Sequence, residues 1–140
     1  MTILQTATTS FKGELYQGVH DFLTDTIKIA LYTANADLNE TTTVYSTANE
    51  VPNSVAYTQG GQTMSGITVN TSDATAYIGF PNVSWSGAIT ARCALIYNFS
   101  KGNKAIAVLD FGSDKTSTAG GAFALTMPAN TATTALIRSQ

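Results

Sequence analysis

Cysteine, histidine and charged residues are all scarce in this sequence. Its 140 residues include one cysteine, one histidine and 11% charged residues, against about 25% in a typical globular domain. A single cysteine cannot form a disulfide within the chain, so we expect folding in a reducing cytosol. One histidine and one cysteine provide no zinc-ligand spacing, and no D-x-[DN]-x-[DN]-G calcium loop is present. These shortages predict no metal-binding residues.

Basic residues are also few, and they are scattered. The seven lysines and arginines run from Lys12 to Arg138, and the formal net charge is −2. Because no basic stripe is available to neutralise phosphates, we expect no binding to nucleic acid. The longest apolar runs, such as 105–109, are far shorter than the roughly 20 residues that span a bilayer. No signal peptide is recognisable, so we expect no membrane partner.

In place of charged residues, the sequence is rich in threonine, serine, asparagine and alanine. A neutral polar surface suits packing against other subunits, but abundant threonine is equally typical of a β-protein. Apolar alternation predicts a mainly β chain. The expected strands are 26–33, 62–70, 74–80, a short one at 83–85, 89–98, 104–111 and 122–127. Residues 1–9 are predicted to be an arm, and 129–140 a last strand or a tail.

One helix is predicted near the N-terminus. Ser10 can cap it, and Phe11, Leu15, Val19 and Phe22 form one apolar stripe over about three turns. After the strand at 26–33, residues 34–56 lose periodicity and predict a long loop with a short helical turn near 44–50. A second loop is expected at 112–121.

The stretch 79–112 organises the predicted fold. It contains a hairpin with arms near 89–98 and 104–111 and a turn at 100–103, where glycine and asparagine can adopt positive φ. Both faces of each arm are largely apolar, which is typical of a central strand covered on both sides. This register places Arg92 opposite or diagonal to Asp110, as a buried or half-buried salt bridge that fixes register.

Residues able to carry chemistry do not form a recognisable catalytic set. His20 lies inside the predicted helix, and we expect a surface or helix-edge position for it. Cys93 lies mid-strand and is expected to act as a small core hydrophobe. No pair of the nine carboxylates is framed by aromatic residues as in a glycosidase. We therefore predict no enzyme, with no catalytic, cofactor-binding or metal residues and no cofactor.

Several short motifs run in order over nearly the whole chain. They are FKGELYQG (11–18), DTIKIALYT (25–33), EV (50–51), YTQGGQ (57–62), VSWSGAITARCALIY (83–97) and LDFG (109–112). This ordered set resembles a family of small virion structural proteins of tailed bacteriophages. The sequence departs from the family at Cys93, where an aromatic residue is common, and in its longer Thr/Ala-rich end at 129–140. No functional residues are carried over from the family.

The resemblance implies an antiparallel β-sandwich with one short N-terminal helix, formed as a single domain by residues 10–128. It also implies a non-enzymatic capsid decoration or cement protein, made in the host bacterial cytoplasm and located on the capsid exterior of the virion. Its expected partner is the major capsid protein, whose lattice it would bind from outside as a homo-oligomer and thereby stabilise the head. The expected contact segments are 1–9, 34–56, 112–121 and 129–140.

Two other classes remain open at this point, and an enzyme ranks last. One is a tail or fibre component of the virion. The other is a carbohydrate-binding module, which would need a flat exposed row of aromatic side chains. The candidates for that row are Tyr45, Tyr57, Tyr77 and Trp85, although the apolar context of Trp85 favours a core position.

Overall fold

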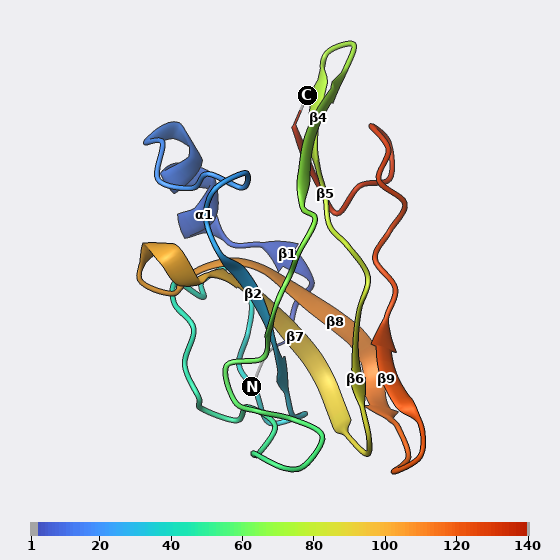
Figure 1. The fold of residues 1–140 in the computed structure, drawn as a ribbon. Helices are drawn as coiled ribbons and strands as arrows, with labels where there is room; N and C mark the ends of the chain where they lie inside the picture. The colour runs from blue at the N-terminus through green and yellow to red at the C-terminus, as the bar shows by residue number, and fades with distance from the viewer. Residues whose placement is uncertain (1–2, 140) are drawn as a thin grey trace.

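Within the part of the chain that the structure describes, there are three antiparallel β-sheets and one short α-helix (Figure 1). The structure is a computed structural model that describes residues 3–139. The helices are α1 (Thr9–Tyr16) and the 3-10 turn η1 (Phe99–Lys101). The strands are β1 (Thr6–Ala7), β2 (Ile27–Tyr32), β3 (Gln62–Thr63), β4 (Thr68–Ser72), β5 (Thr75–Gly79), β6 (Val83–Ser86), β7 (Thr90–Asn98), β8 (Lys104–Thr116), β9 (Ala122–Leu125) and β10 (Ile137–Ser139).

The sheets pack as a sandwich. The five-stranded sheet has the order β1-β8-β7-β2-β3, and two smaller sheets, β10-β5-β4 and β6-β9, pack across it. The main core lies between the layers. It joins Ile29 and Ile96 of the large sheet to Phe80, Trp85 and Phe123 of the opposite layer. The expected fold class, an antiparallel β-sandwich with one short N-terminal helix, is confirmed.

The five-stranded sheet is also covered on its outer face. A second apolar cluster contains Ala30, Tyr32 and Leu95, and the loop after β2 supplies Leu38 and Tyr45 to it. Successive side chains along a strand point to opposite faces, so β2 and β7 contribute alternately to the two clusters. The expectation that the central strands are covered on both sides is therefore confirmed.

The β7–β8 hairpin has the predicted register. Cys93 lies opposite Asp110, and the Arg92 guanidinium pairs with the Asp110 carboxylate. The exposed fractions of these two side chains are 23% and 25%, so the pair is half-buried as expected. The Gly112 N–H and then Arg92 lower the pKa of the Asp110 carboxyl, although partial burial opposes this shift. That the pair fixes register stays a prediction.

The turn of this hairpin also matches the expectation. It follows η1 and places Gly102 and Asn103 at φ values of 69° and 62°. Glycine has no Cβ, and asparagine tolerates this left-handed region better than most residues. The chain can therefore reverse tightly between two long strands.

The helix is shorter than its apolar stripe predicts. It ends at Tyr16, and Gly18 adopts a positive φ of 69°, a conformation that terminates helices. Phe11 and Phe22 are buried, but Leu15 is exposed. The four-residue stripe was therefore a wrong prediction, and only its two phenylalanines reach the core.

Two predicted loop features also differ. The expected helical turn near 44–50 is absent, because Val44 and Glu50 instead form isolated bridges with Lys104 and Tyr32. The expected loop at 112–121 is wrong in its first half, because β8 continues to Thr116. The strand bulges there: residues 111–114 are inserted between the positions that face Cys93 and Ala91. Bulged residues break the alternation on which the prediction relied.

Both ends of the chain pair with its own sheets. β1 pairs with β8, and a parallel bridge joins Ile3 to Leu38. β10 (Ile137–Ser139) lies within the segment 129–140, for which a last strand or a tail was expected, and it pairs with β5. Residues 1, 2 and 140 belong to the predicted arm and tail but lie outside the described residues.

Candidate functional site

The single histidine is buried, not at the surface. The His20 side chain has no exposed area, and its Nε2 lies 2.8 Å from a carboxylate oxygen of Glu14. Its Nδ1 lies 2.9 Å from the amide nitrogen of Asn98, whose oxygen accepts from the Lys101 backbone N–H. The amide nitrogen therefore donates to Nδ1, which places the ring proton on Nε2, facing Glu14. The ring is held as a structural link between α1 and the end of β7.

A second carboxylate completes this cluster. Asp25 accepts from the Asn98 amide at 2.8 Å and pairs with the Lys101 ammonium at 2.8 Å. Burial raises the pKa of the Asp25 carboxyl, but the hydrogen bonds from Asn98 and Lys101 more than offset this and lower its pKa from 3.8 to about 2. The cluster ties the loop before β2 to the hairpin turn after β7.

This geometry predicts a pH-dependent contribution to stability. The folded-state pKa of Asp25 lies below the unfolded value, so its contribution is fully present above about pH 4 and disappears as the pH falls through about 2. We expect Asp25→Asn to lower the free energy of unfolding by about 1–2 kcal/mol at pH 7. The difference from the wild type should shrink between pH 4 and pH 2 in chemical denaturation. Asp114→Asn, at an exposed position, serves as the control, and a constant difference for Asp25→Asn would contradict the assignment.

A second polar cluster surrounds Glu50. The sequence did not predict that this carboxylate is buried. Glu50 is 4% exposed. Its oxygens accept from the hydroxyls of Tyr45 and Tyr57, both at 2.6 Å, and from the Gly60 N–H at 2.7 Å. Tyr57 also accepts from the backbone N–H of Leu31 at 2.9 Å. We call this set the Glu50 cluster; it fastens the loop after β2 to β2 itself.

The tyrosines of this region are held as neutral phenols. Burial and then Glu50 raise the pKa values of Tyr45 and Tyr57 well above the ordinary range. Burial raises the pKa of Tyr97 to about 12, and its hydroxyl donates to the Gly60 carbonyl. The Tyr45 ring stacks on the Tyr97 ring with centroids 4.5 Å apart. No buried side-chain polar atom among the described residues lacks a partner, so these groups serve the fold.

Cys93 has the core role that its strand position predicted. It is fully buried in the outer-face cluster. Burial raises the pKa of its thiol to about 12, although Arg92 opposes the shift. A thiol of this kind is not ionised near neutral pH and is not a nucleophile.

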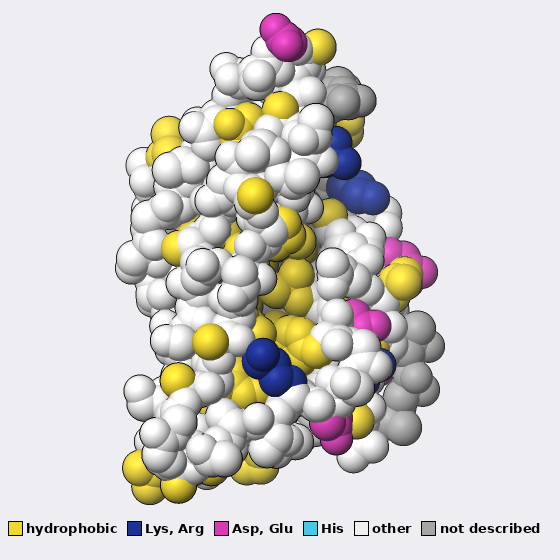
Figure 2. Space-filling view, turned by 90° about the vertical axis from the view of Figure 1, so that its right-hand side faces the viewer, with side chains coloured by type: hydrophobic (Ala, Val, Ile, Leu, Met, Phe, Trp, Pro, Cys, Tyr) yellow, Lys and Arg dark blue, Asp and Glu magenta, His cyan; other side chains and the backbone are white. Residues whose placement is uncertain are grey.

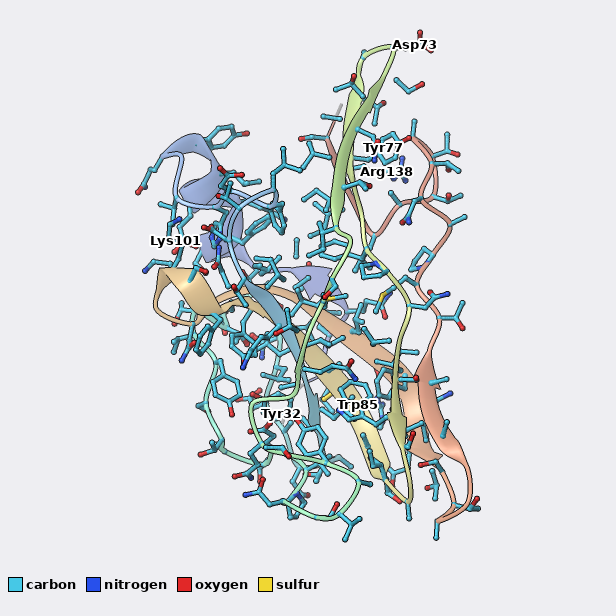
Figure 3. All side chains as sticks on the ribbon, in the orientation of Figure 1. Tyr32, Asp73, Tyr77, Trp85, Lys101 and Arg138 are labelled. Carbon is cyan, nitrogen blue, oxygen red and sulfur yellow. The ribbon has the colours of Figure 1, made fainter. Side chains whose placement is uncertain are left out.

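The predicted row of aromatic residues for carbohydrate binding does not form. Tyr57 and Trp85 are both buried, and Figure 3 shows Trp85 between the sheet layers, where it packs edge-on against Phe123. Tyr45 lies stacked on Tyr97 in the outer-face cluster, and Tyr77 lies across the sandwich on β5. These four side chains do not share one exposed face.

The strongest candidate surface is an apolar groove between α1 and the β10-β5-β4 sheet. We call it the α1 groove; its volume is about 350 Å³, and its lining includes Lys12, Leu15, Tyr16, Val69, Ile137 and Arg138. The exposed fractions are 42% for Leu15, 94% for Tyr16 and 48% for Val69. Leu15 belongs to the predicted stripe and Tyr16 is the last residue of α1, and neither is buried in the core. The groove therefore presents apolar side chains with two cationic side chains and no carboxylate.

A second apolar hollow lies on another face. Figure 2 shows hydrophobic side chains gathered along a central depression, with a basic side chain at its lower end and acidic side chains to its right. Its lining includes Leu109 and Phe111 of β8, and Leu125 and Met127 at and beyond β9. These side chains are mostly the outer rim of the main core, so this hollow exposes less apolar surface than the α1 groove.

Comparisons with known proteins provide no assignment. No protein-family model, curated protein or solved structure matches this chain. Within residues 3–139, no group of three or more histidine, cysteine or acidic side chains is placed to hold a metal ion. No helix of the described chain is long and apolar enough to cross a membrane.

Proposed function

We propose that this chain is a non-enzymatic structural protein of a tailed-phage virion, most specifically a capsid decoration protein. In this role it binds the outer surface of the major capsid protein lattice as a homo-oligomer and stabilises the head. The ordered motifs described above support the virion class. The observation that carries the contact role is the α1 groove, because exposed apolar side chains gathered in one place mark protein-binding surfaces.

Most of the motif residues support the fold. Glu50 and Tyr57 meet in the Glu50 cluster, and Trp85 lies in the main core. Gly61 fits against the backbone of β2, where a side chain would collide with Ile29. These motif residues build the sandwich, whereas the motif FKGELYQG (11–18) also contributes the exposed Leu15 and Tyr16 to the α1 groove. The contact residues are sought among the exposed ones.

The α1 groove suits attachment to a repeating lattice. Full burial of one large apolar side chain contributes about 1.5–3 kcal/mol, so burying Leu15, Tyr16 and Val69 provides a modest affinity per site. Many such sites on one shell, linked through an oligomer, give a much higher overall avidity. The small number of charges also means that little charge must be desolvated on contact.

The N-terminal arm is not a suitable segment for testing this proposal. Thr6 and Ala7 pair with β8 of the same chain, and Thr8 caps α1 by accepting from the Phe11 N–H. Deleting residues 1–9 would therefore remove an edge strand and a helix cap. Lower capsid occupancy of such a variant would report instability as well as lost contact.

Single substitutions in the α1 groove give a cleaner test. We expect Leu15→Asp and Tyr16→Asp each to weaken binding to shells that lack this protein by about tenfold or more, because they put a carboxylate into an apolar contact. Binding is measured by co-sedimentation with purified shells. Leu23→Asp is the matched control, because Leu23 is 70% exposed, does not line the α1 groove and lies outside the expected contact segments.

Two results would contradict the proposal. One is shell binding that survives both groove substitutions, which would show that the α1 groove is not the contact surface. The other is a failure to detect the chain in mature particles by mass spectrometry, which would exclude the virion role itself. We expect labelled electron microscopy to find the protein on the head; label on the tail would replace the decoration role by a tail or fibre role.

A further inference from the structure

Strand β4 forms a free edge of the β10-β5-β4 sheet. Among residues 3–139, no strand pairs with β4 on the side away from β5, and no backbone hydrogen bond reaches that side. The β4–β5 hairpin projects beyond the five-stranded sheet, with Asp73 at its tip (Figures 1 and 3). An edge of this kind presents unpaired N–H and C=O groups and acts as a template for another strand.

The edges of the five-stranded sheet are short or protected. The outer edge of β8 is covered by β1, the Gln5 side chain accepts from the Asp110 N–H, and the bulge at 111–114 follows. Strand β3 has two residues. A backbone carbonyl of β6, that of Ser84, accepts from the Gln62 amide. By contrast, β4 reads Thr-Val-Asn-Thr-Ser and has no charge, proline or glycine, the usual devices that discourage edge pairing.

We propose that β4 pairs antiparallel with β4 of a second copy of this chain, around a two-fold axis at Asn70. The two three-stranded sheets then form one continuous six-stranded sheet. This register pairs all five residues of the strand. Thr68 lies opposite Ser72 of the partner subunit, and Val69 lies opposite Thr71 of the partner subunit.

The composition of β4 favours a second copy over a different protein. In a two-fold interface the same patch meets itself, so a charged central residue would face its own charge. Here the residue on the axis is an amide, and the flanking pairs are hydroxyl with hydroxyl and valine with threonine, which are favourable cross-strand neighbours. The strand offers no charge by which a different partner could be selected.

Pairing would also cover exposed apolar surface. Val69 lines the α1 groove and is half exposed. Residues directly opposite in an antiparallel pair share one face of the sheet, so the Val69 side chains of both copies lie on the same face, close to the axis. The two α1 grooves then open on that common face, as a bivalent surface. The inference concerns the purified chain and does not depend on the virion role.

The test introduces charge at the axis. Asn70→Asp and Asn70→Lys each place like charges opposite one another, so we expect each to weaken the wild-type dimer by about tenfold or more. An equimolar mixture of the two variants should regain dimer formation, because opposite charges then meet. Dimerisation is measured by sedimentation velocity over a concentration series, with circular dichroism to verify folding. Thr90→Asp and Thr90→Lys, at an exposed position of β7, are the matched controls.

Restoration by mixing supports pairing at β4 specifically, since a general loss of folding is not repaired by a second variant. A wild-type chain that stays monomeric at every concentration overturns the inference. So does a dimer that neither Asn70 variant weakens. Shell binding by a monomeric variant would leave attachment to the shell intact without the dimer, so attachment to the shell and pairing at β4 fail separately.

Discussion

Replacing Gly61 with alanine is expected to lower the free energy of unfolding by about 4 kcal/mol or more. A Cβ added to Gly61 would lie 1.8 Å from the carbonyl oxygen of Ile29 and 2.8 Å from the Cα of Ala30. Both are backbone atoms of β2 in the centre of the sandwich, so neither can move without disturbing the sheet. Urea denaturation followed by tryptophan fluorescence measures the change, since Trp85 is buried in the core.

Gly66→Ala separates the collision from the backbone strain. Gly66 also has a positive φ, 86°, but a Cβ there meets nothing within 4 Å. The left-handed conformation alone costs about 1–2 kcal/mol for a residue with a side chain, so Gly66→Ala should lose no more than that. Equal losses for the two variants would show that the close approach to β2 is unimportant.

Glu50→Ala should produce the second large loss of stability, about 3 kcal/mol. The substitution removes the acceptor of two tyrosine hydroxyls and of the Gly60 N–H, and each buried donor left unsatisfied costs about 1–3 kcal/mol. Water entering the space would recover part of this cost, which keeps the total below the simple sum. Thermal and urea unfolding give the change in the free energy of unfolding.

Two further variants define the role of this carboxylate. Glu50→Gln keeps the side-chain shape but offers only one acceptor oxygen, so we expect a loss between those of the wild type and Glu50→Ala. Glu40→Ala, at an exposed position in the same loop, should change stability by less than about 0.5 kcal/mol. If Glu50→Ala behaved like Glu40→Ala, the Glu50 cluster would have no part in holding the loop.

These predictions bear on function because they distinguish residues that stabilise the fold from residues on the proposed contact surfaces. The Glu50 cluster and Gly61 belong to motifs that support the proposed virion class, and both act inside the molecule. The α1 groove and the free edge of β4 lie on the outside. Leu15 and Tyr16 of the groove belong to the motif FKGELYQG (11–18), whereas Asn70 of β4 belongs to none of the motifs. Substitutions of Leu15, Tyr16 and Asn70 should therefore alter assembly while leaving stability nearly unchanged.

Sequence patterns predicted strands correctly where residues near in the chain determine the strand and its facing. Residues 26–33 predicted β2 and the division of its side chains between two faces, and 122–127 predicted β9 with Phe123, Leu125 and Met127 facing inward. The hairpin turn and the approach of Arg92 to Asp110 also followed from local pattern, because a turn position sets the register of both arms. In each case the information lies within a few residues of the feature.

Local patterns failed where distant segments decide the outcome. The stripe of Phe11 and Leu15 predicted a helix of three turns, but Gly18 ends the helix and leaves Leu15 exposed. His20 was expected at the surface or at the helix edge. Its side chain is instead buried, and its Nδ1 contacts the amide nitrogen of Asn98, at the far end of β7. The bulge in β8 depends on how β7 and β8 fit together, which alternation along one strand does not report.

The sequence by itself determined that this chain forms an antiparallel, mainly β fold with few chemically active side chains, because composition and period-two alternation are properties of the chain alone. The tertiary structure alone decided which polar groups are buried together, as at Glu50, and which apolar groups are left exposed, as at Leu15, Tyr16 and Val69. Burial depends on contacts between segments far apart in the chain. The contact surfaces from which we infer function therefore appear only when the sheets have packed.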